Sequence, residues 1–248
     1  MIIQPDLKIF KSRHKTKKPQ LMWIKASGDL ETPVSIMIRV ANKKANSFLL
    51  ESVQGGSQRG RYSAIGLDPD LIWKCQGSKA EINHNPSDKK SEFIKEKVSA
   101  LNSLEAIIDE SRIDIPENLP PMSSGLFGYI GYDMIRLMEK IPDKNKDSLN
   151  LPDGLLIRPK IMIIFDNVED VVYIITPIWP KKSMDILSAY KAGEKRLINI
   201  VNSFEKRIVK EKSKKTKNYS PKPKSNTTKS QYFTMVKKAK KYIRDGDI

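Results

Sequence analysis

The stretch PKIMIIFDNVEDVVYIITPIW restricts the fold more than any other part of the sequence. Two apolar runs, residues 161–165 and 171–176, flank the short polar segment DNVED, which is the pattern of a β-hairpin. Both runs are apolar at odd and even positions, so neither face of the hairpin suits contact with water. We therefore expect this hairpin at the centre of its sheet.

Four more strand candidates precede the hairpin, and turn signals such as LDPD and HNPSD separate them. They are residues 48–52, 62–65, 71–75 and 80–83. This spacing predicts an antiparallel meander. The single cysteine, Cys75, lies in one of these strands and is expected in the core, since one cysteine forms no internal disulfide.

Apolar residues at helical spacing predict helices over 91–111 and 184–209, with a short helix over 133–140. A further amphipathic helix starts at Ser230, which we expect to be its N-cap. The segment ETPVSIMIRVAN is ambiguous: β-branched residues at every second position favour a strand, whereas Thr32 and Pro33 are typical of a helix start. Three glycines in SSGLFGYIGYD indicate close backbone approach or a bulge.

The net charge of +16 raises the question of nucleic acid as a partner. About half of this excess lies between Lys206 and Lys224, and lysine far outnumbers arginine along the chain. Base readout favours arginine interleaved with aromatic residues, so we interpret the charge as a solvated, lysine-rich surface. Residues 210–229 read as a loop or linker. Neither a signal peptide nor a membrane span is expected, which predicts a cytoplasmic protein.

The stretch LLESVQGGSQRGRYSAIG places a carboxylate and a hydroxyl, Glu51 and Ser52, at the end of an apolar strand. A Gly-rich turn follows directly. Either the strand has reached the surface, or a small polar ligand is held there. The residues alone leave both interpretations open.

Four stretches carry a resemblance to a known family: LLESVQGGSQRGRYSAIGLDPD, SSGLFGYIGYDMIRLMEKIP, the hairpin, and YFTMVKKAKKYIRDGDI. In this order they resemble the N-terminal half of anthranilate synthase component I, a chorismate-utilising family. The resemblance implies an α+β fold, the N-terminal part of an αββα sandwich with largely antiparallel sheets and flanking helices. It also implies that the ETPVSIMIRVAN segment is a helix.

For the whole subunit, the family activity would be conversion of chorismate and ammonia to anthranilate and pyruvate in tryptophan biosynthesis. The ammonia would come from a glutamine amidotransferase partner, component II. Mg²⁺ and the catalytic residues would belong to the C-terminal half, so we expect neither a catalytic nor a metal-binding residue in this chain.

The resemblance implies an effector site for L-tryptophan at Leu50, Glu51 and Ser52, with Arg61 and Tyr62 as further lining residues. It also implies a division into a regulatory and structural domain over 1–209, the loop over 210–229, and the first helix of a catalytic domain over 230–248. Two alternatives stay open: aminodeoxychorismate synthase component I of folate biosynthesis, and, less favoured, a basic nucleic-acid-binding module.

Overall fold

The computed structural model describes residues 2–14, 18–41, 44–52, 60–143, 146–180, 184–207 and 223–248. The chain divides into two compact units, Met1–Ile208 and Val209–Ile248. The predicted boundaries at 209 and 229 stay a prediction, and residues 210–222 of the expected loop lie outside the described part.

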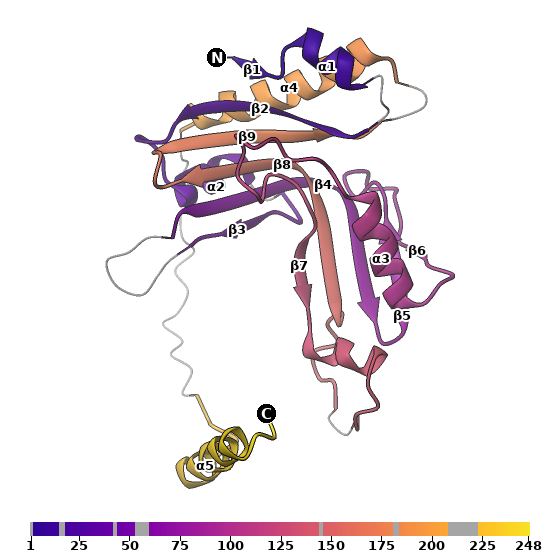
Figure 1. The fold of residues 1–248 in the computed structure, drawn as a ribbon, viewed down its shortest axis with the longest axis vertical. Coiled ribbons are helices and arrows are strands. Elements are labelled where there is room, and N and C mark those ends of the chain that lie inside the picture. Colours follow the sequence, from indigo (N-terminus) through magenta and orange to yellow (C-terminus); the bar gives the residue numbers. More distant parts are fainter. Residues whose placement is uncertain are drawn as a thin grey trace. The chain divides into compact units, whose positions relative to one another are not determined.

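The first unit is built on one antiparallel sheet in the order β1-β2-β9-β8-β4-β5-β6, with β3 paired to β4 and β7 paired to β8 (Figure 1). The strands are β1 Ile3–Gln4, β2 Gln20–Ser27, β3 Phe48–Leu50, β4 Tyr62–Gln76, β5 Lys79–Asn83, β6 Ile94–Lys95, β7 Phe127–Ile130, β8 Gly154–Asp166 and β9 Val171–Ile178. The expected hairpin is β8–β9 and lies inside this order, so its central position is confirmed.

The helices are α1 Leu7–His14, α2 Pro33–Ala41, α3 Ala100–Glu110, the 3₁₀ helix η1 Tyr132–Leu137, α4 Ile186–Phe204 and α5 Lys229–Asp245. Side chains of α1, α2 and α4 share one buried cluster with one face of the central strands. The other face packs against residues of the segment that leads to β7, including Leu119. Successive side chains of β8 therefore alternate between the two clusters. Ile163 belongs to the first cluster, and Met162 and Ile164 belong to the second.

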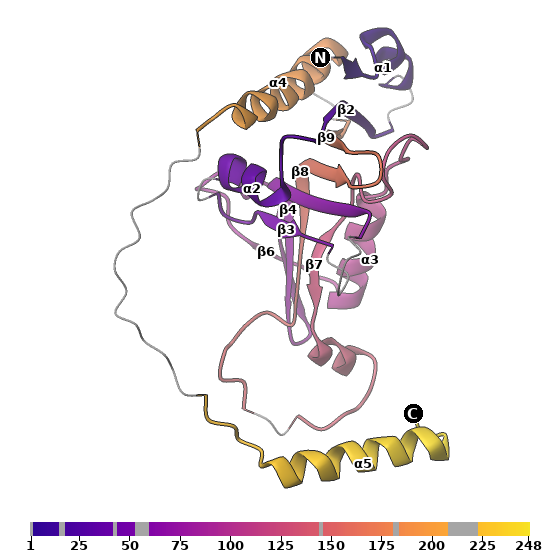
Figure 2. The same cartoon turned by 90° about the vertical axis from the view of Figure 1, so that its left-hand side faces the viewer.

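Strands β4 and β8 extend beyond strands β2 and β9 of the sheet. Their far halves contribute to a third cluster, which α3 covers (Figures 1 and 2). Trp73 is fully buried there and donates a hydrogen bond to the Ser103 hydroxyl at 3.0 Å. Cys75 lies in the same cluster, as expected, and burial raises the pKa of its thiol. The predicted α+β fold class is confirmed.

The expected turn LDPD is instead part of the continuous strand β4, so the prediction of two separate strands is wrong. The register with β8 shifts between Pro69 and Leu71, and Asp68 has a φ of 50°. A bulge of this kind adds a residue without ending the strand. It lies where β4 changes direction, and turn-forming residues therefore occur inside a long strand.

The predicted helix over 91–111 is too long, because its first part forms β6 and a loop. Ile94 pairs with Ile82 of β5, and α3 begins only after Ser99, whose hydroxyl accepts a hydrogen bond from the Asn102 amide. The helix over 133–140 is a 3₁₀ helix. α4 begins after the cap Asp185, within the range predicted for this helix.

Two further predictions are confirmed: close backbone approach at the glycines of SSGLFGYIGYD, and a helix in the segment ETPVSIMIRVAN. A Cβ at Gly128 would lie 1.9 Å from the Leu155 carbonyl oxygen, so β7 approaches β8 too closely for any side chain. The segment with Pro33 is the helix α2, and the Thr32 hydroxyl accepts a hydrogen bond from the Ser35 amide. The N-cap chemistry and the resemblance therefore outweighed β-propensity.

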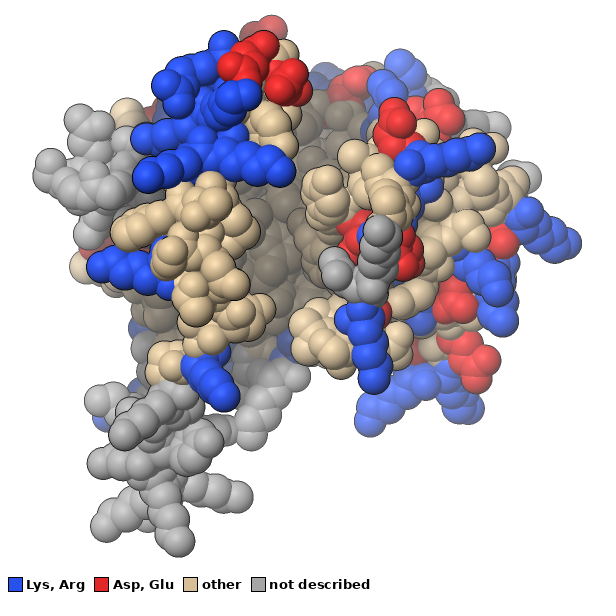
Figure 3. Space-filling view, turned by 90° about the horizontal axis from the view of Figure 1, so that it is seen from below, with Lys and Arg blue, Asp and Glu red and all other residues tan. Residues whose placement is uncertain are grey.

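The second unit contains α5, whose N-cap is Thr228 rather than the expected Ser230. Thr228 and Gln231 form a reciprocal capping box, which satisfies two backbone amides at once. None of the described side chains of α5 is buried. Figure 3 shows a band of uncharged residues along this helix, with basic side chains gathered toward one end.

Candidate functional site

The segment predicted to bind an effector lies at the open end of the β3–β4 pair. Leu50 pairs with Ala64, and the next two residues continue beyond the ladder. The Ser52 amide donates a hydrogen bond to the Ser63 hydroxyl at 3.3 Å, which keeps the segment next to β4. Leu50 is 54 % exposed, and Glu51 and Ser52 are exposed as well. Strand pairing therefore fixes the backbone while these three side chains face solvent.

Ser52 also lies directly over Gly60, the residue that leads into β4. A Cβ at Gly60 would be 1.7 Å from the Ser52 hydroxyl oxygen. Only a residue without a side chain leaves space for Ser52 in this position. The two residues therefore form one local arrangement, although residues 53–59 between them lie outside the described part of the chain.

Arg61 lies close to this segment but makes an ion pair with Asp166, at the end of β8. Its Nε and Nη2 atoms donate to the Asp166 carboxylate at 2.9–3.1 Å, and Glu169 lies 3.6 Å from Nη2. The hydrogen bond to Asp166 raises the pKa of the Arg61 guanidinium. Its charge is therefore compensated, and a role in ligand binding would require sharing this carboxylate.

Asp166 stabilises the turn of the β8–β9 hairpin through its hydrogen bonds. Its side chain is 2 % exposed and also accepts hydrogen bonds from the Val168 and Glu169 amides. Burial raises the pKa of this carboxyl, but the hydrogen bonds from Arg61 and the two amides outweigh burial and hold the pKa below its ordinary value of 3.8. Asp166 is thus ionised at neutral pH and has a structural role in the turn.

Tyr62 is partly buried and packs against the cluster on the second face of the sheet. The Arg61 guanidinium lies 4.9 Å from the centre of the Tyr62 ring, close enough for a cation–π contact. Arg61 and Tyr62 are therefore near the predicted site, but both have structural partners. The site residues Leu50, Glu51 and Ser52 stay a prediction, as do Arg61 and Tyr62.

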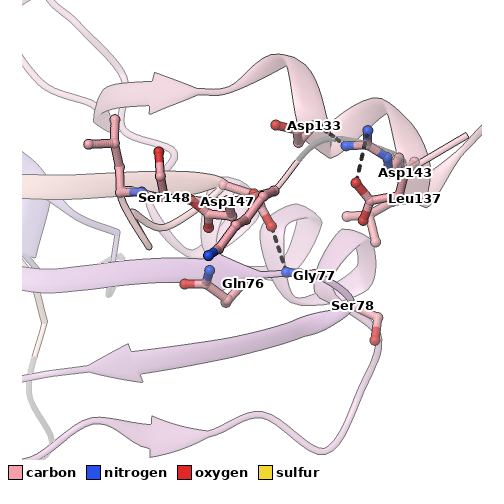
Figure 4. Close-up of a pocket in the computed structure, with 12 residues that line it drawn as sticks. Gln76, Gly77, Ser78, Asp133, Leu137, Asp143, Asp147 and Ser148 are labelled. Atoms are coloured by element: carbon pink, nitrogen blue, oxygen red, sulfur yellow. Dashed lines mark hydrogen bonds and ion pairs between the residues drawn. The ribbon is translucent and has the colours of Figure 1, made fainter. Parts of the chain in front are cut away.

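A hollow with a volume of about 610 Å³ lies at the opposite end of the long strands β4 and β8. Figure 4 shows Gln76, at the end of β4, and Gly77, in the β4–β5 turn, facing Asp147 and Ser148 of the segment before β8. Arg136 forms ion pairs with Asp133 and Asp143, and Lys146 also lines the hollow. The hollow is therefore polar and contains charges of both signs.

The remaining acids of this hollow stabilise turns. Asp153 accepts a hydrogen bond from the Gly77 amide at 2.6 Å, and Asp147 accepts from the Leu149 and Asn150 amides. In the described part of the chain, no group of three or more His, Cys, Asp or Glu side chains could hold a metal ion. Among the same residues, no helix is long and apolar enough to cross a membrane.

Sequence reasoning missed a group of basic side chains beside the β4 bulge: Lys44, Lys160, Arg196 and Lys206. They come from three parts of the chain: Lys44 follows α2, Lys160 lies on β8, and Arg196 and Lys206 lie in and just after α4. No linear motif could therefore reveal this group.

Comparison with known proteins identifies the family. The chain is 38% identical over 239 residues to anthranilate synthase component 1 of Cereibacter sphaeroides, which covers 96% of this chain and 48% of the relative. The corresponding Pseudomonas putida protein is 32% identical and is covered to 44%. The chain thus spans about half the length of these curated relatives.

The fold matches a solved structure as well. Anthranilate synthase component I from Streptococcus pneumoniae superposes with a TM-score of 0.53 at 21% identity, covering 89% of this chain and 45% of that one. The family described as chorismate binding enzymes matches residues 45–248, more than half of the chain. The chain therefore belongs to the chorismate binding enzyme family.

Proposed function

We propose that this chain is part of the large subunit of an anthranilate synthase and carries the regulatory portion of that subunit. The observation that supports this most is the 38% identity to a component 1 protein along 96% of the chain. The whole subunit would convert chorismate and ammonia to anthranilate and pyruvate. The relatives' name, component 1, implies a second component. We propose that this component 2 supplies the ammonia from glutamine.

The proposed role of Leu50, Glu51 and Ser52 is to hold L-tryptophan as a feedback inhibitor. A free amino acid needs acceptors for its ammonium, donors for its carboxylate and an apolar wall for its ring. The exposed Glu51 carboxylate, Ser52 hydroxyl and Leu50 side chain supply one group of each kind. By linkage, tryptophan would inhibit because it binds one conformation of the subunit better than another.

We propose that Mg²⁺ and the catalytic residues of this reaction are held by the C-terminal half of the subunit, as the family resemblance implies. Among the described residues of this chain, no group of three or more acids, cysteines or histidines could hold a metal ion. The cytoplasmic location stays a prediction.

The first test is an assay of the subunit that contains this chain, supplied with chorismate, Mg²⁺ and either ammonia or glutamine with component 2. We expect anthranilate as the product, followed by its fluorescence, and no anthranilate from the 248-residue chain alone. If aminodeoxychorismate forms in its place, the folate-pathway alternative holds. If neither product forms, the proposed activity is wrong.

A further inference from the structure

A second cavity, with a volume of about 510 Å³, lies at the bulge of β4 between β8 and α4. Its charged lining residues are four basic side chains and one acidic side chain: Lys44, Lys160, Arg196, Lys206 and Asp68. The cavity lies entirely within the first unit. Positive charges therefore outnumber negative charges in this cavity. The predicted effector site at Ser52 contains none of these residues, so that site does not account for the excess.

The fold brings this charge together from several elements. Arg196, Asn199 and Ser203 follow one another at helical spacing on the same side of α4. Lys160 lies on β8 next to Pro159, which pairs with Pro69 at the β4 bulge. The cavity therefore lies where the β4 bulge and β8 meet the side of α4 that carries Arg196, Asn199 and Ser203.

The hydrogen bonds of Arg196 go to neutral groups. Its Nε donates to the Thr176 hydroxyl at 2.9 Å, and its Nη2 donates to the Pro177 carbonyl at 3.3 Å. Burial lowers the pKa of Arg196, and the nearby charge of Asp70 opposes this. Among the described residues, no carboxylate lies within ion-pair distance of its guanidinium.

The Thr176 hydroxyl connects Arg196 to Lys160. It accepts the hydrogen bond from Arg196 and donates one to the Lys160 backbone carbonyl at 2.8 Å. The Lys160 ammonium has a hydroxyl partner, Ser87, at 3.2 Å. The one acid of the lining, Asp68, is 2.8 Å from Lys44 and so compensates a different cation. Within the described chain, Lys160 and Arg196 therefore share a cavity without a carboxylate of their own.

A solvated basic surface would be the simplest account of surplus lysines, but it does not fit this pair. Lys160 and Arg196 are only partly exposed, and Arg196 has lost much of its water. Removing a cation from water without an anionic partner is unfavourable. A bound anion would compensate both charges at once.

We propose that this cavity binds a small molecule through a phosphate group, which Lys160 and Arg196 hold. An arginine fork and a lysine point charge together suit phosphate oxygens. The Asn199 and Asn202 side chains and the Ser87 hydroxyl also line the cavity and offer further donors. Ile161 and Ile200 supply an apolar portion, and the volume exceeds that of a phosphate ion alone.

The test is calorimetric titration of the whole subunit with inorganic phosphate, at an ionic strength held constant with sodium chloride. We expect saturable binding to the wild type and at least about tenfold weaker binding to both Lys160→Gln and Arg196→Gln. Lys191→Gln removes the same charge from an exposed position of α4 and should bind as the wild type does.

Lys160→Gln is the informative variant if Arg196→Gln unfolds, since Lys160 gives up only one hydrogen bond to an exposed serine. Its thermal midpoint without phosphate should match the wild type. Equal phosphate affinity in wild type and Lys160→Gln would overturn the proposal, because the ion would then be bound elsewhere. No measurable binding to the wild type would overturn it as well.

Discussion

Basic side chains lie both at the end of the β4–β8 ladder and at its bulge, but the groups that they hydrogen-bond to differ between the two regions. At the end, Arg61 donates to the buried carboxylate of Asp166. At the bulge, Lys160 and Arg196 meet only hydroxyl and carbonyl groups among the described residues. The sequence drew attention to the first region, where arginine is structural. The contrast teaches that the partner of a basic residue, rather than its place in a motif, decides whether it is available to a ligand.

The largest effect on stability that this comparison predicts is at Asp166. Replacing it with alanine removes a buried acceptor of Arg61 and of two backbone amides, which should cost about 3 kcal/mol in the free energy of unfolding. Urea unfolding of the subunit measures the change. Glu169→Ala is the matched control, because Glu169 is 45 % exposed and should change stability little. Equal losses in the two variants would contradict a special role for Asp166.

Acid should act on the same carboxylate. Because the folded state lowers the pKa of Asp166 below 3.8, its ionised form stabilises the protein above that pH. This contribution is lost as the pH falls below about 4, through the folded pKa. We expect Asp166→Asn to be less stable than the wild type at neutral pH and to lose less further stability on acidification. Thermal midpoints between pH 3 and 7 test this, and parallel curves would argue against it.

A smaller effect on stability, with a specific effect on regulation, is expected at Gly60. The added methyl of Gly60→Ala would displace the Ser52 side chain, because the two cannot occupy the same space. We expect weaker inhibition by tryptophan with an unchanged rate of anthranilate formation in its absence. Gly77→Ala is an unsuitable control for backbone strain, since Gly77 has a φ of 54°. Ser78→Ala, at an exposed turn, serves better.

The smallest effect is expected at Lys25, which pairs with Glu169 at 3.0 Å. Both side chains are about half exposed, so Lys25→Ala should change the free energy of unfolding by less than about 0.5 kcal/mol. A loss near that of Asp166→Ala would show that exposure does not separate the two kinds of ion pair, and the comparison would fail.

Local signals in the sequence were sufficient for much of the fold. Two continuous apolar runs on either side of a polar turn located β8 and β9, and the Thr32-Pro33 cap together with the resemblance located α2. Two failures, the predicted helix over 91–111 and the two separate strands predicted within β4, have a common cause, which is pairing between distant residues. Ile94 pairs with Ile82 of β5, and the bulge near Asp68 lies within the ladder that β4 forms with β8.

The candidate sites divide in the same way. Leu50, Glu51 and Ser52 are contiguous, so a linear resemblance could propose them. That Arg61 is engaged by Asp166, 105 positions away, follows only from the hairpin. The cavity at Lys160 and Arg196 is lined by residues from β8 and α4, and their spacing in the sequence does not predict that they lie together.

The central claim is that Ser52 belongs to a tryptophan site in an anthranilate synthase subunit. The most direct measurement is a tryptophan titration of anthranilate formation by the wild-type subunit, by Ser52→Phe and by the control Ser78→Phe. A ring at position 52 should block the site and remove hydrogen bonds to the ligand, so we expect inhibition by tryptophan to weaken at least about tenfold. Uninhibited activity and the control should stay unchanged. An inhibition midpoint in Ser52→Phe equal to that of the wild type would contradict the account and leave Ser52 as a residue at the end of a strand.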